Sequence, residues 1–286
     1  MSKNQMKKLL MCVWLGMSLM ACQKKLESDA ETALNQNEVD IQNYITAQNL
    51  KITKTATGLY YQKLKENPMG DGFKVGDELT IHFTLYTLRG AILDSTERLK
   101  NKPYAFAYGG TRLLPGMEEG LFLSKKGEKI QVLMNHPLAF GSQSSDILPA
   151  YSALGSTMEI LKVRTETQQV DEYIIDKKLT LTEKTTSGLR FIRTTASTEE
   201  LVKTGQTVQV KYTGKLLNDK VFDSGQFAVT VGAGRTIKGF EEGIAKMRRG
   251  EKATLVFSSD LGYGGTSPSA NIPGYAPLAF EVEVLK

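Results

Sequence analysis

The sequence predicts an α+β protein made of two tandem copies of one domain, each a curved antiparallel sheet wrapped on one short helix. The chain of 286 residues is long enough for two domains of ordinary size. A set of short motifs occurs twice in the same order, and in each copy apolar residues alternate as in strands with one solvated face. A segment with helical spacing precedes each copy, so each domain is expected to follow a helical arm.

Two blocks of motifs define the repeat. In the first block LDST at 93–96 returns as FDSG at 222–225, a spacing of 129 residues. In the second block GMEEG at 116–120 returns as GFEEG at 239–243, a spacing of 123 residues. Because the spacing falls from 129 to 123, the first copy carries six extra residues between the blocks, near 98–103 in a polar loop.

The N-terminus has the pattern of a secretion signal. Lysines at positions 3, 7 and 8 precede a short apolar run over 9–20, which small Ala21 ends. The run is too short to cross a bilayer comfortably as a helix. Ala21 is followed by Cys22 in the sequence LMAC, which resembles the lipobox of bacterial lipoproteins and implies a lipid on a mature N-terminal Cys22. The alternative is an ordinary cleaved signal with a chance cysteine.

A lipid on Cys22 tethers the mature chain to a membrane. Gln23 follows, and not the aspartate that resembles an inner-membrane retention signal, which favours the outer membrane and its periplasmic face. The expected organisation is a signal peptide over 1–21, a lipid anchor and helical linker over 22–57, a first domain over 58–165, a helical linker over 166–186 and a second domain over 187–286.

Apolar residues with helical spacing precede both copies. In the first arm they are Ala30, Ala33, Leu34, Ile41, Tyr44 and Ile45, and in the second they are Val170, Tyr173 and Ile174. Two interpretations stay open. Each helix is a spacer or an interaction arm through which a dimer or an envelope complex forms, or each helix packs on its own domain.

The strands and the helix of the second copy follow from alternation and charge. Apolar residues alternate over 208–212 and again over the closing segment 278–284. One helix fits between these strands. It is expected to begin after Gly239 and to end with Arg248 and Arg249, because basic residues favour the C-terminal end of the helix dipole.

Five motifs of the second copy resemble, in order and spacing, the FKBP-type peptidyl-prolyl isomerases. They are VQVKYTG at 208–214, VFDSG at 221–225, IKGFEEG at 237–243, DLGYGG at 260–265 and LAFEVEVLK at 278–286. The resemblance covers both copies and leaves out only the signal and the arms. The tethered two-copy organisation is similar to that of family members associated with gliding motility.

The reaction that this resemblance implies is rotation about the amide bond that precedes a proline. The partial double bond of the amide opposes the rotation with a barrier of roughly 20 kcal/mol. The reaction needs no nucleophile, metal or cofactor, because no covalent bond breaks. An apolar pocket accelerates the rotation by removing water from the amide and by holding the peptide in a turn.

By resemblance, the second copy carries a nearly uncharged aromatic pocket. Its substrate-binding walls are expected to be Tyr212, Phe222, Phe227, Ile237, Phe240, Ile272 and Phe280, with Asp223 and Tyr263 as catalytic residues. Tyr263 offers a hydroxyl to a substrate carbonyl, Asp223 orients the site, and Phe227 and Phe280 are expected to belong partly to the core. Two features depart from the family: the loop that brings a basic residue to Asp223 is missing, and Phe240 stands where many members have tryptophan.

The first copy departs further from the family pattern. At the positions of the second pocket it has Phe83, Leu93, Met117, Phe140 and Ser156, and it retains Asp94. Losing most of the aromatic wall and the tyrosine hydroxyl weakens the binding of a prolyl peptide. We therefore interpret the first copy as a scaffold or a peptide-binding module in preference to a second isomerase.

Other kinds of chemistry find little support in the sequence. His82 is expected to face outward from a strand and His136 to lie in a loop, so no metal site is predicted. The formal charge of +5 falls to +2 when the three lysines of the signal are removed, leaving 33 basic against 31 acidic residues. That balance is too weak to suggest a nucleic-acid partner.

The sequence thus predicts a prolyl isomerase that assists the folding of exported proteins at the bacterial envelope. Its substrates are expected to be proline-containing unfolded or exported polypeptides, without a cofactor. The alternative is a non-catalytic chaperone or a structural peptide-binding lipoprotein of a secretion or gliding complex. The state of the pocket around Asp223 and Tyr263 separates the two hypotheses.

Overall fold

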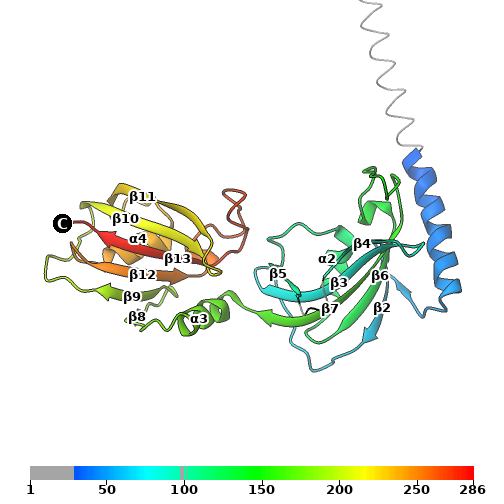
Figure 1. Ribbon diagram of the computed structural model, residues 1–286, viewed down its shortest axis with the longest axis horizontal. Helices are drawn as coiled ribbons and strands as arrows, with labels where there is room; N and C mark the ends of the chain where they lie inside the picture. Colours follow the sequence, from blue (N-terminus) through cyan, green and yellow to red (C-terminus); the bar gives the residue numbers. More distant parts are fainter. Residues whose placement is uncertain (1–28, 97–99, 101) are drawn as a thin grey trace, which may run out of the picture. The chain divides into compact units, whose positions relative to one another are not determined.

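The computed structural model describes residues 29–96, 100 and 102–286. The predicted signal peptide, Cys22 and part of the segment 98–103 lie outside the described residues. The chain forms two compact units, and its strands form two antiparallel sheets that each carry a short helix on one face (Figure 1). These features confirm the predicted α+β fold class with two tandem copies.

The first sheet has seven strands, and the helix α2 (Pro115–Phe122) packs on β6. The strands are β1 (Thr53–Lys54), β2 (Tyr60–Lys65), β3 (Glu78–Thr87), β4 (Ile92–Ser95), β5 (Tyr104–Ala107), β6 (Lys129–Met134) and β7 (Leu154–Arg164). They lie in the order β1-β2-β6-β7-β3-β4, and β5 also pairs with β3. A 3-10 helix, η2 (His136–Leu138), follows β6.

The second sheet repeats this plan with six strands in the order β11-β10-β13-β12-β9-β8. The strands are β8 (Glu183–Lys184), β9 (Arg190–Thr195), β10 (Thr207–Leu216), β11 (Val221–Thr230), β12 (Lys252–Phe257) and β13 (Leu278–Val284). The continuous strand β11 pairs with β10 as both β4 and β5 pair with β3. The second copy can form one strand here because it lacks the six extra residues that the first copy carries between these two strands.

The core of the second copy lies between the sheet and the helix α4 (Lys238–Ala245). Phe240 and Ile244 of α4 pack there with buried residues of the sheet. The predicted end of this helix at Arg249 was wrong. The helix ends at Ala245 because the chain then turns to bury Met247 in the core and to bridge Arg248 to Leu201.

The outer face of each sheet, which points away from α2 or α4, is covered by the arm that precedes it. The first arm is a helix over 29–47, and the second arm is α3 (Glu166–Asp176). In the first copy Ile41 packs with Tyr60, Leu133 and Ala153, and in the second Val170 and Ile174 pack with Ile192, Val256 and Ala279. The structure therefore favours the interpretation that each helix packs on its own domain.

Candidate active site

Five aromatic side chains from three strands and one helix converge on the inner face of the second sheet. They are Tyr212 of β10, Phe222 and Phe227 of β11, Phe240 of α4 and Phe280 of β13. The ring of Tyr212 lies edge-on to those of Phe227 and Phe240, with centroids 5.3 and 5.8 Å away. Phe280 likewise meets Phe222 at 5.6 Å and Phe240 at 5.2 Å. Edge-to-face contacts of this length are favourable for aromatic rings.

The remaining apolar residues predicted for the pocket pack against the same cluster. Ile272 is buried in it, while Ile237 and Tyr263 are half-buried at its edge. The two phenylalanines expected to belong partly to the core differ. Phe280 is buried, with 4% of its surface exposed, whereas Phe227 is 36% exposed and so offers a face to a ligand.

Asp223 lies at the exposed rim of the pocket and accepts a hydrogen bond from the Tyr212 hydroxyl at 2.6 Å. The basic partner that the sequence lacks is thus replaced by a phenol of the pocket itself. Burial, and then the Asp223 carboxylate, raise the pKa of Tyr212 to about 12. Burial and the Asp223 charge also raise the pKa of Tyr263. Both phenols therefore keep their protons and can donate hydrogen bonds at physiological pH.

The hydroxyl of Tyr263 has no hydrogen-bond partner among the described residues, in contrast to that of Tyr212. It follows the short helix η3 (Ser259–Leu261), which fixes its place at the edge of the aromatic cluster. A half-buried donor beside an apolar pocket suits a peptide carbonyl, because the surrounding rings keep competing water away. This geometry agrees with the role that the resemblance implies for Tyr263.

Gly214 of β10 is a pocket residue that the sequence reasoning missed. It pairs with Phe280 on one side and with Asp223 on the other. A Cβ atom at this position would lie 2.7 Å from the Phe222 ring and 2.9 Å from the Phe280 ring. Those distances are too short for any side chain, so the two phenylalanines can meet only over a glycine.

In the first copy the large and the small residue of this pair have changed strands. Leu85 occupies the position of Gly214, since it pairs with Asp94 as Gly214 pairs with Asp223. Leu85 is buried, and Ser156 at the position of Phe280 is fully buried. The comparison of KYTG at 211–214 with HFTL at 82–85 contained this information, because a large residue replaces the glycine.

The other positions of the first pocket agree with its predicted degeneration. Met117 is buried at the position of Phe240, and Phe83 and Phe140 stand at the positions of the two tyrosines. The Ser156 hydroxyl has no hydrogen-bond partner within the described part of the chain. Asp94 is exposed, but no phenol corresponds to the one that holds Asp223. The first copy keeps an apolar lining and loses both tyrosine hydroxyls.

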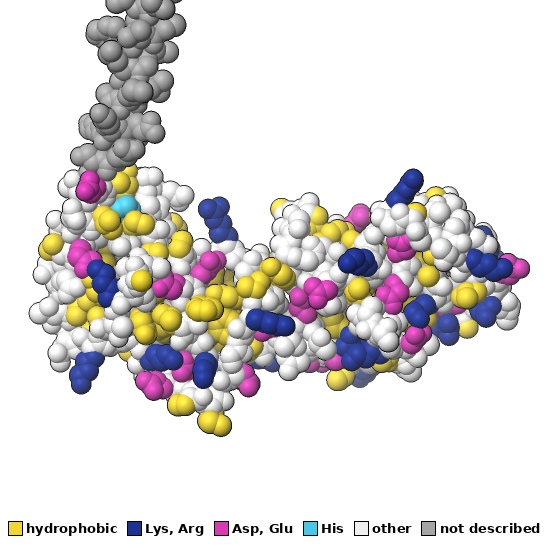
Figure 2. All heavy atoms as spheres, turned by 180° about the vertical axis from the view of Figure 1, so that it is seen from behind, with side chains coloured by type: hydrophobic (Ala, Val, Ile, Leu, Met, Phe, Trp, Pro, Cys, Tyr) yellow, Lys and Arg dark blue, Asp and Glu magenta, His cyan; other side chains and the backbone are white. Residues whose placement is uncertain are grey.

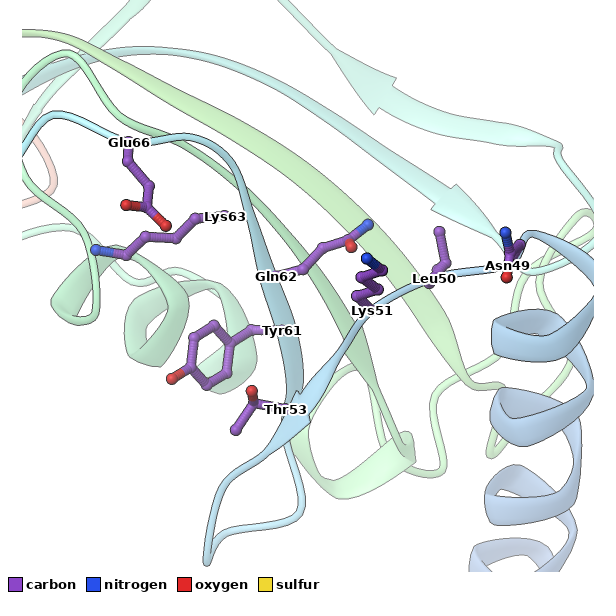
Figure 3. Close-up of a pocket in the computed structure, with 8 residues that line it drawn as sticks. All are labelled: Asn49, Leu50, Lys51, Thr53, Tyr61, Gln62, Lys63 and Glu66. Atoms are coloured by element: carbon purple, nitrogen blue, oxygen red, sulfur yellow. The ribbon is translucent and has the colours of Figure 1, made fainter.

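A separate open groove of about 700 Å³ lies beside β1 and β2 of the first copy. Figure 3 shows its lining residues, which are Asn49, Leu50, Lys51, Thr53, Tyr61, Gln62, Lys63 and Glu66. None of them belongs to either pocket, and most are polar or charged. This lining is unsuited to desolvating a prolyl amide.

The histidines are structural. His82 is buried in β3, where its Nδ1 atom lies 2.9 Å from the Thr96 hydroxyl, so it is not exposed to solvent as expected for an outward-facing strand residue. The hydroxyl gives the buried ring a polar partner. His136 begins η2 and is also buried. Residues 29–96, 100 and 102–286 contain no group of three or more His, Cys, Asp or Glu that could hold a metal.

Charged side chains of both signs mix on the face of the molecule that Figure 2 displays, as expected from the nearly balanced composition. Within the described residues, no helix is both long enough and apolar enough to cross a membrane.

Fold and site together define a class of protein, in which a curved sheet covered by one helix carries a partly exposed aromatic cluster suited to a short apolar segment. A family model described as FKBP-type peptidyl-prolyl cis-trans isomerase matches residues 70–160 and 198–285. The chain therefore belongs to the FKBP-type peptidyl-prolyl isomerase family, with both copies included. The enzyme class is peptidyl-prolyl cis-trans isomerase, and the family binds proline-containing polypeptides.

Several proteins of known sequence or structure are similar to the chain. A probable FKBP-type peptidyl-prolyl cis-trans isomerase of Haemophilus influenzae is 30% identical over 217 residues, which cover 73% of this chain and 85% of that protein. FK506-binding protein 1A of Emericella nidulans is 44% identical over 89 residues, or 29% of this chain and 82% of that protein. The crystal structure of FkpA from Escherichia coli matches with a TM-score of 0.41 and 24% identity, covering 58% of this chain and 74% of that one.

Proposed function

We propose that the second copy is the isomerase and that it acts on exported polypeptides at the bacterial envelope. The assignment of the isomerase to the second copy rests on its complete aromatic cluster, with Tyr263 at the edge. Its counterpart in the first copy has lost the phenols and exchanged Phe280 for Ser156. Among the described residues, only the second pocket combines an aromatic lining with a tyrosine hydroxyl that is free to donate.

The pocket acts on the prolyl amide through its environment. The planar amide is stabilised by resonance and by water on its polar atoms, and the twisted amide is less polar. Placing the bond against the aromatic surface formed by Tyr212, Phe240 and Phe280 removes that water, which disfavours the planar state more than the twisted state. The Tyr263 hydroxyl holds a carbonyl of the substrate and fixes the turn. Both effects favour the transition state over the ground state.

The first copy is proposed to bind the substrate peptide without catalysing its isomerisation. Its pocket positions keep the apolar residues Leu93, Met117 and Phe140, which suit an unfolded segment. A second weak site on the same chain raises the effective concentration of substrate near the first. The same observation supports the alternative that this copy is a peptide-binding part of a secretion or gliding complex.

The envelope location is supported by the N-terminal sequence. The short apolar run and the LMAC motif favour a lipid on Cys22, and Gln23 favours the outer membrane and its periplasmic face. Proteins arrive in that compartment unfolded, and uncatalysed prolyl isomerisation takes tens of seconds or more. An isomerase tethered there has substrates within reach.

A protease-coupled prolyl isomerisation assay on the mature chain tests the assignment of the activity. Tyr212→Phe with Tyr263→Phe in the second copy should remove most of the turnover. The matched change in the first copy, Phe83→Ala with Phe140→Ala, should leave it within about twofold of wild type. Equal turnover in the second-copy variant would favour the alternative of a binding module. Loss confined to the first-copy variant would reverse the assignment.

A further inference from the structure

The second arm is joined to the second domain by a half-buried carboxylate, that of Glu166. Glu166 lies in the first turn of α3, next to Thr165, which caps the helix in a reciprocal pair with Gln168. Its Oε2 atom accepts the backbone N–H of Ser259 at 2.5 Å, and its Oε1 atom accepts the Ser259 hydroxyl at 2.8 Å. Ser259 is 1% exposed. One side chain of the arm thus accepts hydrogen bonds from both donors of a single buried residue, the N–H and the hydroxyl of Ser259.

Ser259 in turn fixes the backbone on both sides of Tyr263. Its carbonyl accepts the N–H groups of Gly262 and Gly264, both at 2.8 Å. Tyr263 lies between these two glycines, so the position of Ser259 sets where the tyrosine leaves the chain. A series of hydrogen bonds therefore runs from the arm to the two glycines that flank Tyr263.

We propose that Glu166 is a positioning residue for Tyr263, so that the second arm sets the geometry of the isomerase site. The inference rests on the proposed function, in which Tyr263 binds a substrate carbonyl. A misplaced hydroxyl loses this bond in the transition state although every pocket residue is present. Displacement of functional groups by about 1 Å is enough to lower a rate substantially.

The first copy contains the same device with an amide in place of the acid. Asn37 of the first arm accepts the N–H of His136 with its Oδ1 atom at 2.8 Å. The carbonyl of His136 accepts the N–H groups of Ala139 and Gly141, which flank Phe140. An amide can therefore fill the role sterically, because it accepts from an N–H and can donate to a hydroxyl.

The negative charge of Glu166 does not stabilise the folded domain relative to a neutral side chain. Burial raises the pKa of the Glu166 carboxyl above its usual value and Asp260 adds to the rise, while two hydrogen bonds from Ser259 lower it. An acid whose pKa is raised by folding lowers the free energy of unfolding at neutral pH relative to its protonated form. Replacing Glu166 by glutamine should therefore leave the thermal midpoint unchanged or raised.

The test compares three changes on α3 in the mature chain. Glu166→Ala should lower kcat/KM by about the same factor as Tyr263→Phe, roughly tenfold or less. Both variants lose the same hydrogen bond, the one from the Tyr263 hydroxyl to the transition state. Adding Tyr263→Phe to Glu166→Ala should cost no more than about a further twofold, because both act on one contact. Glu166→Gln should restore activity to within about twofold. Asp171→Ala removes the other carboxylate of the arm that binds the domain, through Arg190 at 2.6 Å, and should leave turnover per folded molecule near wild type.

Fluorine NMR of the protein with fluorotyrosine gives a second readout that does not need turnover. The Tyr263 resonance, assigned by its loss in Tyr263→Phe, should shift or broaden in Glu166→Ala and stay in place in Asp171→Ala. Equal behaviour of these two variants in both measurements would overturn the inference. Losses from Glu166→Ala and Tyr263→Phe that multiply would also overturn it. A shifted resonance in a chain whose pocket variants do not alter turnover would reject the proposed function and leave the positioning role standing.

Discussion

At the scale of single residues, the pocket offers a substrate two kinds of contact, a large apolar surface and one hydroxyl. Phe222 is half-buried and meets Phe280 at 5.6 Å, whereas Tyr263 contributes a hydroxyl. We predict that Phe222→Ala lowers kcat/KM more than Tyr263→Phe. The hydroxyl is worth about 0.5–1.5 kcal/mol net, a factor of about tenfold or less. Losing the ring both shrinks the apolar surface and admits water to the amide.

Phe222 is a better subject for this comparison than Phe280. Phe280 is 4% exposed and stacks on Phe257, so its truncation costs about 3–5 kcal/mol of stability. Turnover per folded molecule should be measured after circular dichroism has shown the folded fraction. Asp94→Ala in the first copy is the matched control and should leave turnover unchanged. A larger loss from Tyr263→Phe than from Phe222→Ala would contradict a mechanism based on desolvation.

A small residue faces a large one at one position pair of both copies. The pair is Gly214 and Phe280 in the second copy, and Leu85 and Ser156 in the first. This reversal of sizes gives a second prediction. Ser156→Phe alone places a large ring beside the buried Leu85 and should lower the free energy of unfolding by about 1–3 kcal/mol, the usual cost of overpacking. Adding Leu85→Gly should recover part of this loss, because it recreates the pairing of the second copy. Urea denaturation of the four variants of this cycle measures the coupling. Strictly additive effects would show that the two positions do not share space.

At the scale of elements, the arms are the third layer of each domain. Val170 and Ile174 of α3 pack on the outer face of the second sheet, where Arg190 is also 4% exposed beneath Asp171. Burying Val170 and Ile174 is worth about 1.5–3 kcal/mol each. Small domains are stable by about 5–15 kcal/mol in total. The arm therefore supplies a substantial part of the stability of the isomerase domain.

This packing predicts that the minimal stable fragment begins at Thr165 and not at Ser187. Residues 165–286 should unfold cooperatively, and residues 187–286 should lose about 3–6 kcal/mol, because the outer face of the sheet is then exposed. Ile174→Ala in the longer fragment should cost about 2–5 kcal/mol, while its exposed neighbour Ile175 is the matched control and should tolerate alanine. Equal urea midpoints for the two fragments would show that α3 does not stabilise the domain.

The inner face of each sheet could be predicted from the sequence, and the outer face could not. Alternation placed Val208 and Val210 inside, and the five motifs placed the pocket, because each motif is local. Residues that point outward, such as Ile192 and Val256, are apolar too, but alternation cannot show what covers them. The bond from Glu166 to Ser259 joins residues 93 positions apart, and no spacing rule predicts such a contact. Gly214 was missed because its role depends on two rings that meet only in the folded sheet.

At the scale of the whole molecule, two copies follow a proposed membrane anchor. The first described residue of the first arm, at position 29, follows Cys22 by seven positions. A fully extended chain of that length spans about 25 Å, so a lipid on Cys22 would keep the first domain close to the membrane surface. The described residues add no membrane-spanning helix. In the proposed organisation, attachment to the membrane depends on Cys22 alone.

Replacing this residue gives the last prediction. Cys22→Ala should move the protein from the membrane fraction to the soluble fraction, because each buried methylene of a lipid contributes about 0.8 kcal/mol to membrane binding and no other anchor is proposed. Its turnover on a soluble proline peptide should equal that of the wild type, since Cys22 is outside both pockets. Mass spectrometry of the wild-type protein should find a lipid on an N-terminal Cys22. A membrane-bound Cys22→Ala variant, or an unmodified wild-type chain that begins elsewhere, would refute the anchor, whereas the isomerase assignment depends only on the second pocket and would stand.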